Sequence, residues 1–311
     1  MYADDDTDHA QDPDPSRLLS KIQYEADCST SWVADNKLVC SGKKTKLMII
    51  ATTAMRNSRL NGQQLQIKVC GKTVKESESE RILGVIANNK LTWWHHLYGD
   101  LSDPNKPVPG LISQLSKRVG MLSQLVKLLP HEKFVKTVNG IFMSKLMYCL
   151  QLIGNVWCDD TFEGFNERNH SFTKQNLHSL QILQNKVLRL LTGKGYDTHI
   201  VDLLSEAKML SVNQLIAYTT IVSIHNIKKV GEPIYLANKL AANRNQVIEL
   251  RQRQHNIQVN FNKARGREGF LYRGRLLFNA LPISIQSEER TYHFKKLTKQ
   301  YILEHIPAIP S

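Results

Sequence analysis

The sequence lacks the cysteine patterns that stabilise small secreted domains or hold structural zinc. Its five cysteines form an odd, scattered set without a C-x-x-C pair, and no Cys/His knuckle is present. This argues against a disulfide framework and a cysteine-based zinc site. We therefore expect reduced thiols, an intracellular location in the cytoplasm or nucleus, and no disulfide-linked partner. The cysteines are Cys28, Cys40, Cys70, Cys149 and Cys158.

Long hydrophobic runs are also missing. The longest apolar stretch, from Ile141 to Trp157, is interrupted by Lys145, Gln151 and Asn155. A membrane span needs about 20 predominantly apolar residues, so this stretch is typical of a buried helix. The acidic start has no apolar run, and we expect neither a signal peptide nor a membrane partner.

Several short catalytic motifs are incomplete or absent. Gly71-Lys72-Thr73 follows a predicted strand, but a phosphate-binding loop also needs glycine where Gln66 stands. The aspartates near the start do not form a calcium loop, because His9 occupies the glycine position. His95-His96 has no third ligand at helical or strand spacing, which argues against a metal site. No G-x-S-x-G sequence of a hydrolase occurs.

Positive charge is abundant. Lys and Arg total 41 against 28 Asp and Glu, for a net charge of +13. Six of the acidic residues lie in the first fourteen positions, so the chain from Pro15 onward carries +19. Such a body attracts polyanions, most commonly nucleic acid. The most basic part runs from Arg244 to Arg275 with aromatics interleaved, a mixture that suits RNA or single-stranded nucleic acid, and equally a solvated basic loop. Its candidate binding residues are Arg265, Arg267 and Arg273.

The first six residues place carboxylates side by side. Tyr2 and Ala3 are followed by Asp4, Asp5 and Asp6, which can form the tight turn of a β-hairpin. Two negative charges ~4 Å apart repel by about 4 kcal/mol at an effective dielectric near 20, and a bound Mg²⁺ removes that cost. The alternative is an acidic, frayed terminus.

A series of motifs follows this turn in a fixed order, and together they resemble the reverse transcriptases of non-LTR retrotransposons, the jockey-like group in particular. The resemblance covers nearly the whole chain. Its residues are Tyr2-Ala3-Asp4-Asp5; Trp32 with Asn36-Lys37-Leu38 and Lys43-Lys44-Thr45-Lys46; Ile82-Leu83-Gly84-Val85-Ile86 with Leu91-Thr92-Trp93 and His96; Leu180-Gln181, Leu183-Gln184-Asn185 and Arg189; and Phe278-Asn279, Leu281-Pro282 and Phe294-Lys295.

The resemblance implies an RNA-directed DNA polymerase that extends a DNA primer on an RNA template from deoxynucleotides. Asp4 and Asp5 would be catalytic carboxylates that bind Mg²⁺ or Mn²⁺ for two-metal nucleotidyl transfer. Lys44 would approach the departing pyrophosphate, with Lys43 and Lys46 as alternatives. The family's further catalytic aspartate, from an earlier palm strand, has no counterpart here. We therefore expect the chain alone to be inactive, as the C-terminal part of a polymerase.

The same resemblance assigns nucleic-acid contacts. Tyr2 would lie beside the template–primer duplex, and Leu83-Gly84 would form the primer-grip turn, where the glycine allows close backbone approach. Lys117 and Arg118 would contact the duplex backbone without reading its sequence. A rival interpretation is a non-enzymatic basic RNA- or DNA-binding module, and a third is the product of a decayed element.

The expected fold is α+β: a small antiparallel palm-remnant sheet with one helix, followed by a mostly helical thumb and a basic helical C-terminal module. The domains would be residues 1–98, 99–160 and 161–311. Expected strands are Leu47–Ala51, Leu65–Val69, Thr73–Lys75 and Ile82–Ile86, with a turn at Cys70-Gly71-Lys72 that joins the second and third in a hairpin. The first expected helix runs from Pro15, with Asp14 as its N-cap, to a left-handed Asn36. The others run from about Leu111 to Pro130, from Glu132 to Trp157, through Leu180–Leu191 to Gly193, from Ser211 through His225, and from Arg290 to Glu304, the last packing through Phe294, Leu297 and Tyr301.

Overall fold

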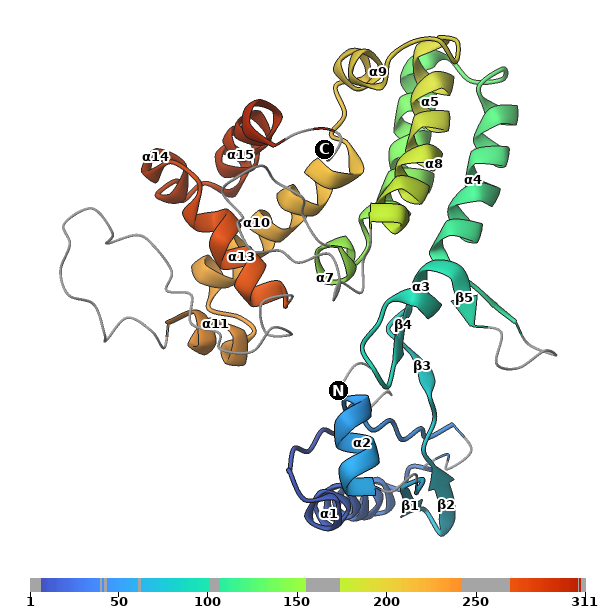
Figure 1. The fold of residues 1–311 in the computed structure, drawn as a ribbon, viewed down its shortest axis with the longest axis vertical. Helices are drawn as coiled ribbons and strands as arrows, with labels where there is room; N and C mark the ends of the chain where they lie inside the picture. The colour runs from blue at the N-terminus through green and yellow to red at the C-terminus, as the bar shows by residue number, and fades with distance from the viewer. Residues whose placement is uncertain are drawn as a thin grey trace. The chain divides into compact units, whose positions relative to one another are not determined.

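The computed structural model describes residues 7–39, 41, 44–60, 63–100, 107–154, 174–241, 269–306 and 308. The chain divides into two compact units, residues 1–96 and 97–311, and each is considered by itself (Figure 1). The fold is mixed α and β, predominantly helical, with antiparallel strand pairs. No helix in the described residues is long and apolar enough to cross a membrane.

The first unit opens with α1, Pro15–Asp35. Asp14 caps it as the sequence predicts, since its side chain accepts a hydrogen bond of 2.8 Å from the backbone N–H of Ser16. The predicted end is wrong by one position. Asn36 has φ −88°, and Lys37 takes the left-handed conformation with φ +58°. The Asn36 side chain instead donates to the carbonyl of Trp32.

Two strands form the predicted hairpin: β1 (Gln66–Val69) pairs antiparallel with β2 (Lys72–Lys75). Val69 lies opposite Lys72, and the two loop residues, Cys70 and Gly71, both have positive φ. That combination is typical of a type I′ turn, whose twist matches that of the strands. Gln23 of α1 bonds to the backbone N–H and carbonyl of Lys68, each at 2.8 Å.

Segment 47–51 is not the expected strand. Leu47 makes one isolated parallel bridge, to Glu76, whereas Ala51 donates to the carbonyl of Asn89 at 3.2 Å. The segment therefore changes hydrogen-bond partners along its length, and no continuous ladder forms. It still supplies Leu47 and Ile49 to the core.

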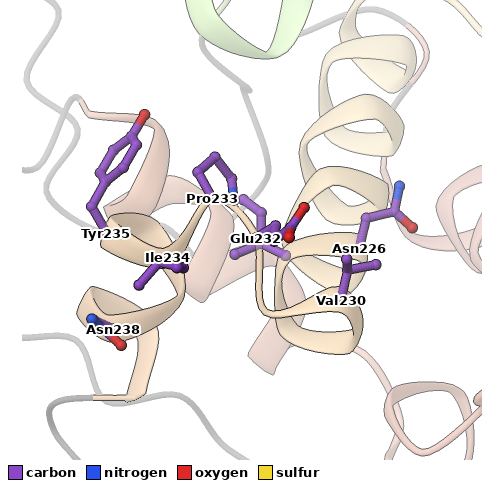
Figure 2. A pocket seen from close by; sticks show the side chains of 8 residues that line it. Asn226, Val230, Glu232, Pro233, Ile234, Tyr235 and Asn238 are labelled. Carbon is purple, nitrogen blue, oxygen red and sulfur yellow. The ribbon is translucent and has the colours of Figure 1, made fainter.

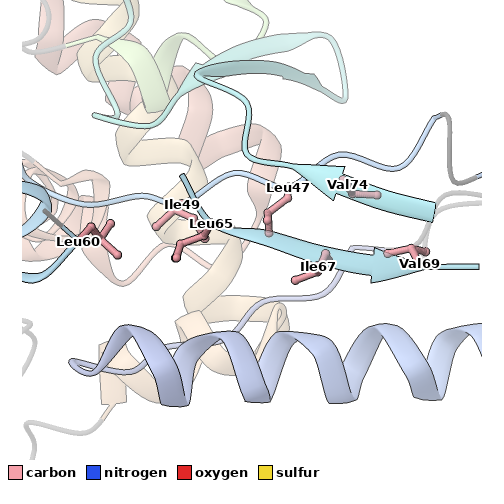
Figure 3. Close-up of a cluster of buried hydrophobic side chains, with 7 residues drawn as sticks. All are labelled: Leu47, Ile49, Leu60, Leu65, Ile67, Val69 and Val74. Carbon is pink, nitrogen blue, oxygen red and sulfur yellow. The ribbon is translucent and has the colours of Figure 1, made fainter. Parts of the chain in front are cut away.

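A layer of apolar side chains between α1 and the hairpin forms the core of this unit (Figure 3). Fully burying one such side chain stabilises a fold by about 1.5–3 kcal/mol. The helix α2 (Thr53–Leu60), which was not among the predicted elements, contributes Leu60. Its Arg56 pairs with Glu76 and donates to the carbonyl of Ile49. The buried residues are Leu47, Ile49, Leu60, Leu65, Ile67, Val69 and Val74.

The predicted strand Ile82–Ile86 is wrong, because a turn divides it. β3 (Ser79–Ile82) pairs antiparallel with β4 (Val85–Asn88), and Leu83-Gly84 connects them. Each hairpin is a separate two-stranded sheet, so the described residues do not form the single small sheet that was expected. A short helix, α3 (Trp94–Tyr98), follows.

The second unit is mainly helical, with one short strand pair. The pair is β5 (Gly99–Asp100) and β6 (Val108–Pro109). The helices are α4 (Leu111–Leu125), α5 (His131–Val138), the π-helix η1 (Asn139–Met143), α6 (Ser144–Met147), α7 (Leu150–Ile153), α8 (Lys174–Thr192), α9 (Ile200–Ala207), α10 (Val212–Val230), α11 (Ile234–Ala241), α13 (Phe270–Asn279), α14 (Ile283–Gln286) and α15 (Thr291–His305).

α10 lies at the centre of this unit and packs against α7, α8, α11, α13 and α15 (Figure 1). It begins as predicted, since Ser211 and Gln214 form a capping box. Gly231, with φ +77°, follows its last residue. Most of its side chains are buried, as expected for a helix surrounded by others.

The helix predicted from Glu132 to Trp157 is interrupted. It widens into the π-helix η1, and the helix is broken at Tyr148 and Cys149, where Cys149 has φ +57°. Residues 155–157 lie outside the described part. The predicted end of α8 at Gly193 is confirmed, with φ +69°.

α15 agrees with its predicted range to within one residue at each end. Its packing differs, because Thr298 and Ile302 are buried with Phe294 while Leu297 is 36% exposed. α4 and α5, from the predicted thumb, contact α8 within one compact unit.

Candidate nucleic-acid interface

The turn between β3 and β4 presents an apolar side chain to solvent. Leu83 has φ +46° and is 60% exposed, and Gly84 has φ +84°. Glycine adopts this conformation freely, whereas the left-handed region costs a residue with a side chain about 1–2 kcal/mol. Two left-handed residues are what a type I′ turn of a two-residue hairpin loop requires, as at Cys70-Gly71, so the exposed Leu83 side chain is what makes this turn a candidate contact site.

Two sets of hydrogen bonds join β4 to the residues that follow it. The Nδ2 of Asn88 donates to the Thr92 hydroxyl at 2.6 Å, and the backbone N–H of Thr92 donates to Asn88 Oδ1 at 2.7 Å. The backbone N–H of Ile86 donates to His96 Nδ1 at 3.3 Å. His96 is buried, so it positions the hairpin and does not face a ligand.

Lys44, Lys43 and Lys46, the candidates for the lysine that approaches the departing pyrophosphate, differ in their surroundings. Lys44 is exposed, and no described carboxylate pairs with it. Lys46 Nζ lies 3.3 Å from Glu80 Oε1 on β3 and is already engaged in an ion pair. Lys43 lies outside the described residues, so the choice among the three lysines stays open.

The candidate metal ligands are not among the described residues. Asp4, Asp5 and Tyr2 belong to the first six positions, and Arg265 and Arg267 to the segment 242–268. In the described ranges, no group of three His, Cys, Asp or Glu side chains could hold a metal ion. The expected Mg²⁺ site therefore stays a prediction.

α4 carries the two cations assigned to the thumb, and their positions differ. Lys117 is exposed. Arg118 is half-buried, and its guanidinium donates to the carbonyl of Ile141 in η1. The wider turn of a π-helix changes the usual backbone pairing, and Arg118 supplies a donor there. Lys117 is thus available to a ligand, whereas Arg118 also ties α4 to η1.

The exposed face of α4 around Lys117 is polar and has small side chains. A Cβ added to Gly120 would meet no atom within 4 Å, so this part of the face is open. The helix contains no acidic residue. A phosphate backbone could approach closely without repulsion from α4. The exposed residues are Ser113, Ser116, Lys117, Gly120, Met121, Ser123 and Gln124.

Arg273 was predicted to contact nucleic acid, but the structure buries it. Only 4% of it is exposed, and its neighbour Arg275 is 2% exposed and donates to the carbonyl of Lys239. Burial lowers the pKa of Arg275. α13 approaches α10 closely, since a Cβ on Gly274 would lie 2.5 Å from Ile224 Cγ1. Arg273 therefore belongs to the helix interface and is out of reach of a nucleic acid in this structure.

The glutamine-rich motif on α8 forms a buried polar network. Gln181 Nε2 donates to Gln184 Oε1 and to Asn185 Oδ1, each at 2.9 Å, and Gln181 Oε1 accepts from the N–H of Val212 at 2.9 Å. Gln184 Nε2 donates to the carbonyl of Leu210 at 2.8 Å. These amides join α8 to the start of α10, so their role is structural.

The aromatic motif near the end of the chain is also part of the core. The rings of Phe278 and Phe294 are stacked 6.3 Å apart, and His225 of α10 stacks on Phe294 at 3.7 Å. His225 Nε2 bonds to the carbonyl of Glu288 at 3.0 Å. Burial lowers the pKa of His225, and the bond to Glu288 partly opposes that effect.

One open pocket of about 850 Å³ lies where α10 passes into α11 (Figure 2). Its lining is largely apolar and includes the exposed Val230, Ile234 and Tyr235, with the carboxylate of Glu232 beside them. None of the predicted site residues lines it.

The comparisons with known proteins are negative: the chain matches no model of a protein family, no curated protein and no solved structure.

Proposed function

We propose that this chain is part of the RNA-directed DNA polymerase of a jockey-like non-LTR retrotransposon. It would span the YADD turn, the end of the palm, the thumb and a C-terminal module. What supports the proposal is the ordered series of motifs over nearly the whole sequence, together with the basic charge from Pro15 onward.

The observation that carries the proposal is the local structure of one motif. Leu83-Gly84 is an exposed turn with left-handed backbone, and Thr92 and His96, from the same motif, bond to the strand behind it. An exposed turn of this kind suits a primer grip, because its backbone and the Leu83 side chain are accessible to the end of a strand.

The metal chemistry would belong to Asp4 and Asp5. Two Mg²⁺ or Mn²⁺ ions, when bound in the intact enzyme, would stabilise the attacking and leaving oxygens of nucleotidyl transfer. The site also needs an aspartate that has no counterpart in this sequence, so we expect the purified chain to incorporate no nucleotide. Lys117 and the face of α4 would contact the duplex backbone.

The second candidate is a basic RNA- or DNA-binding module with no metal site, which the charge of +13 also favours. Mn²⁺ binding distinguishes the two. We expect the purified full chain to bind Mn²⁺, measured by electron paramagnetic resonance, and the variant Asp4→Asn/Asp5→Asn to bind it about tenfold or more weakly. The control Asp8→Asn/Asp35→Asn removes the same charge at exposed positions and should bind Mn²⁺ as the wild type does.

Equal Mn²⁺ affinity in all three proteins would rule out the metal site and leave the module. Nucleotide incorporation on a primed RNA template that Asp4→Ala abolishes would instead show that the chain is active by itself.

A further inference from the structure

α15 has two faces of opposite character. Phe294, Thr298 and Ile302 follow each other at intervals of four, and all three are buried in the second unit. Residues three, four and seven positions apart also share a helix face. On the outer side, Tyr292, Lys296 and Lys299 have this spacing, with Lys295 beside them.

The outer face is strongly basic. Tyr292 is 76% exposed, Lys295 and Lys296 are exposed, and Lys299 is half-buried. Among the described residues, no carboxylate lies within ion-pair distance of these three lysines. The only acidic residue in α15 is Glu304, in its last turn.

A further lysine lies next to this face. The Nζ of Lys299 donates to the carbonyl of Lys208 at 2.9 Å, at the end of α9. The side chain of Lys208 is exposed. This hydrogen bond extends the positive surface from one helix to a second.

Folding accounts for Lys299, which donates to the carbonyl of Lys208 at the end of α9, but not for the exposed Lys295 and Lys296. Like charges one turn apart on a helix destabilise it slightly, and the lysines of α15 bury no acidic partner. A bound polyanion offsets that repulsion, since each lysine that contacts a phosphate releases a condensed counterion.

The exposed tyrosine selects among polyanions. An exposed aromatic ring beside cations can stack on a base only where the base is unpaired. We propose that the outer face of α15, formed by Tyr292, Lys295, Lys296 and Lys299 with Lys208 beside it, binds single-stranded RNA. The choice of RNA rests on the proposed function, whereas the surface itself does not depend on the metal site.

The experiment measures the binding of a fluorescent 15-nucleotide oligouridylate to the purified full chain by anisotropy, over a series of KCl concentrations in EDTA. Lys295→Gln/Lys296→Gln should reduce the slope of log affinity against log salt by about 1.4, at about 0.7 for each phosphate that is no longer neutralised. Tyr292→Ala should weaken binding about tenfold without changing the slope, and Tyr292→Phe should restore it.

The matched control is Lys186→Gln/Lys239→Gln, which removes the same charge from exposed positions of α8 and α11 in the same unit. Its slope should stay that of the wild type. Circular dichroism should show that all variants remain folded, because the substituted side chains are exposed.

Equal effects of the two double variants would overturn the proposal, as would a wild type that does not bind the oligonucleotide. A third contradicting result is Lys295→Gln/Lys296→Gln weakening binding to phosphatidylserine vesicles but not to RNA, which would assign the surface to a membrane. Because EDTA removes divalent metal, the RNA-binding result does not depend on the metal site. It can therefore be interpreted even if the Mn²⁺ experiment above fails.

Discussion

Protonation of His225 should destabilise the second unit. The ring is 4% exposed, stacks on Phe294 at 3.7 Å and bonds through Nε2 to the carbonyl of Glu288. A carbonyl only accepts hydrogen bonds, so Nε2 carries the proton in the neutral ring. A second proton would place a charge inside the core, near Lys228 and Lys229, and burial accordingly lowers the pKa of His225.

Because the pKa of His225 is lower in the folded state, acid destabilises the fold. The folded state binds the proton less readily than the unfolded chain, whose histidine titrates at about pH 6.5. This contribution to stability is therefore fully present above about pH 6.5 and is lost as the pH falls toward the lower folded pKa. One proton changes the free energy of unfolding by at most about 1.4 kcal/mol per pH unit.

Urea unfolding of the wild type and of His225→Phe between pH 7.5 and 5.0 measures this effect. Phenylalanine retains a ring against Phe294 and does not titrate. The variant should be less stable at pH 7.5 by about 1–3 kcal/mol, because the partly buried carbonyl of Glu288 loses its donor. Below about pH 6.5 the wild type should lose up to about 1.4 kcal/mol per pH unit more than the variant. Parallel pH profiles would refute the argument.

Three other substitutions test the described hydrogen bonds and turn by the same unfolding measurement. Gln184→Leu should cost about 1–3 kcal/mol because the carbonyl of Leu210 loses its donor, and no loss would mean that the amide network adds nothing. Gly84→Ala should cost about 1–2 kcal/mol, since alanine at φ +84° is strained, and an unchanged midpoint would contradict the turn geometry. Asp14→Ala should cost about 1 kcal/mol and Asp14→Ser far less, and equal losses would exclude the capping bond to Ser16.

Local signals in the sequence predicted the elements that depend on one or two residues. Asp14 before a proline, Ser211 before an apolar helix, and Gly193 after one each marked a helix end, because the capping bond or the left-handed backbone resides in that residue. Cys70-Gly71 similarly marked a hairpin. These predictions agree with the structure.

The predictions that failed depended on tertiary partners. An apolar run at Ile82–Ile86 is compatible with either a strand or a turn, and Gly84 decides for the turn only once both strands have partners. Arg273 belongs to a basic, aromatic stretch that is typical of a surface, yet the close approach of α13 and α10 buries it. Periodicity alone does not contain that information. For Asp4, Asp5 and the Mg²⁺ site, the sequence motif remains the whole basis of the prediction.

The pair of hydrogen bonds between Gln23 and Lys68 has a consequence for association. Because Gln23 bonds to both backbone groups of Lys68, an extended segment of another chain could join β1 there only by displacing that amide. Unpaired strand edges are common starting points for aggregation and for strand exchange. A single glutamine of α1 thus opposes strand addition to β1 at Lys68.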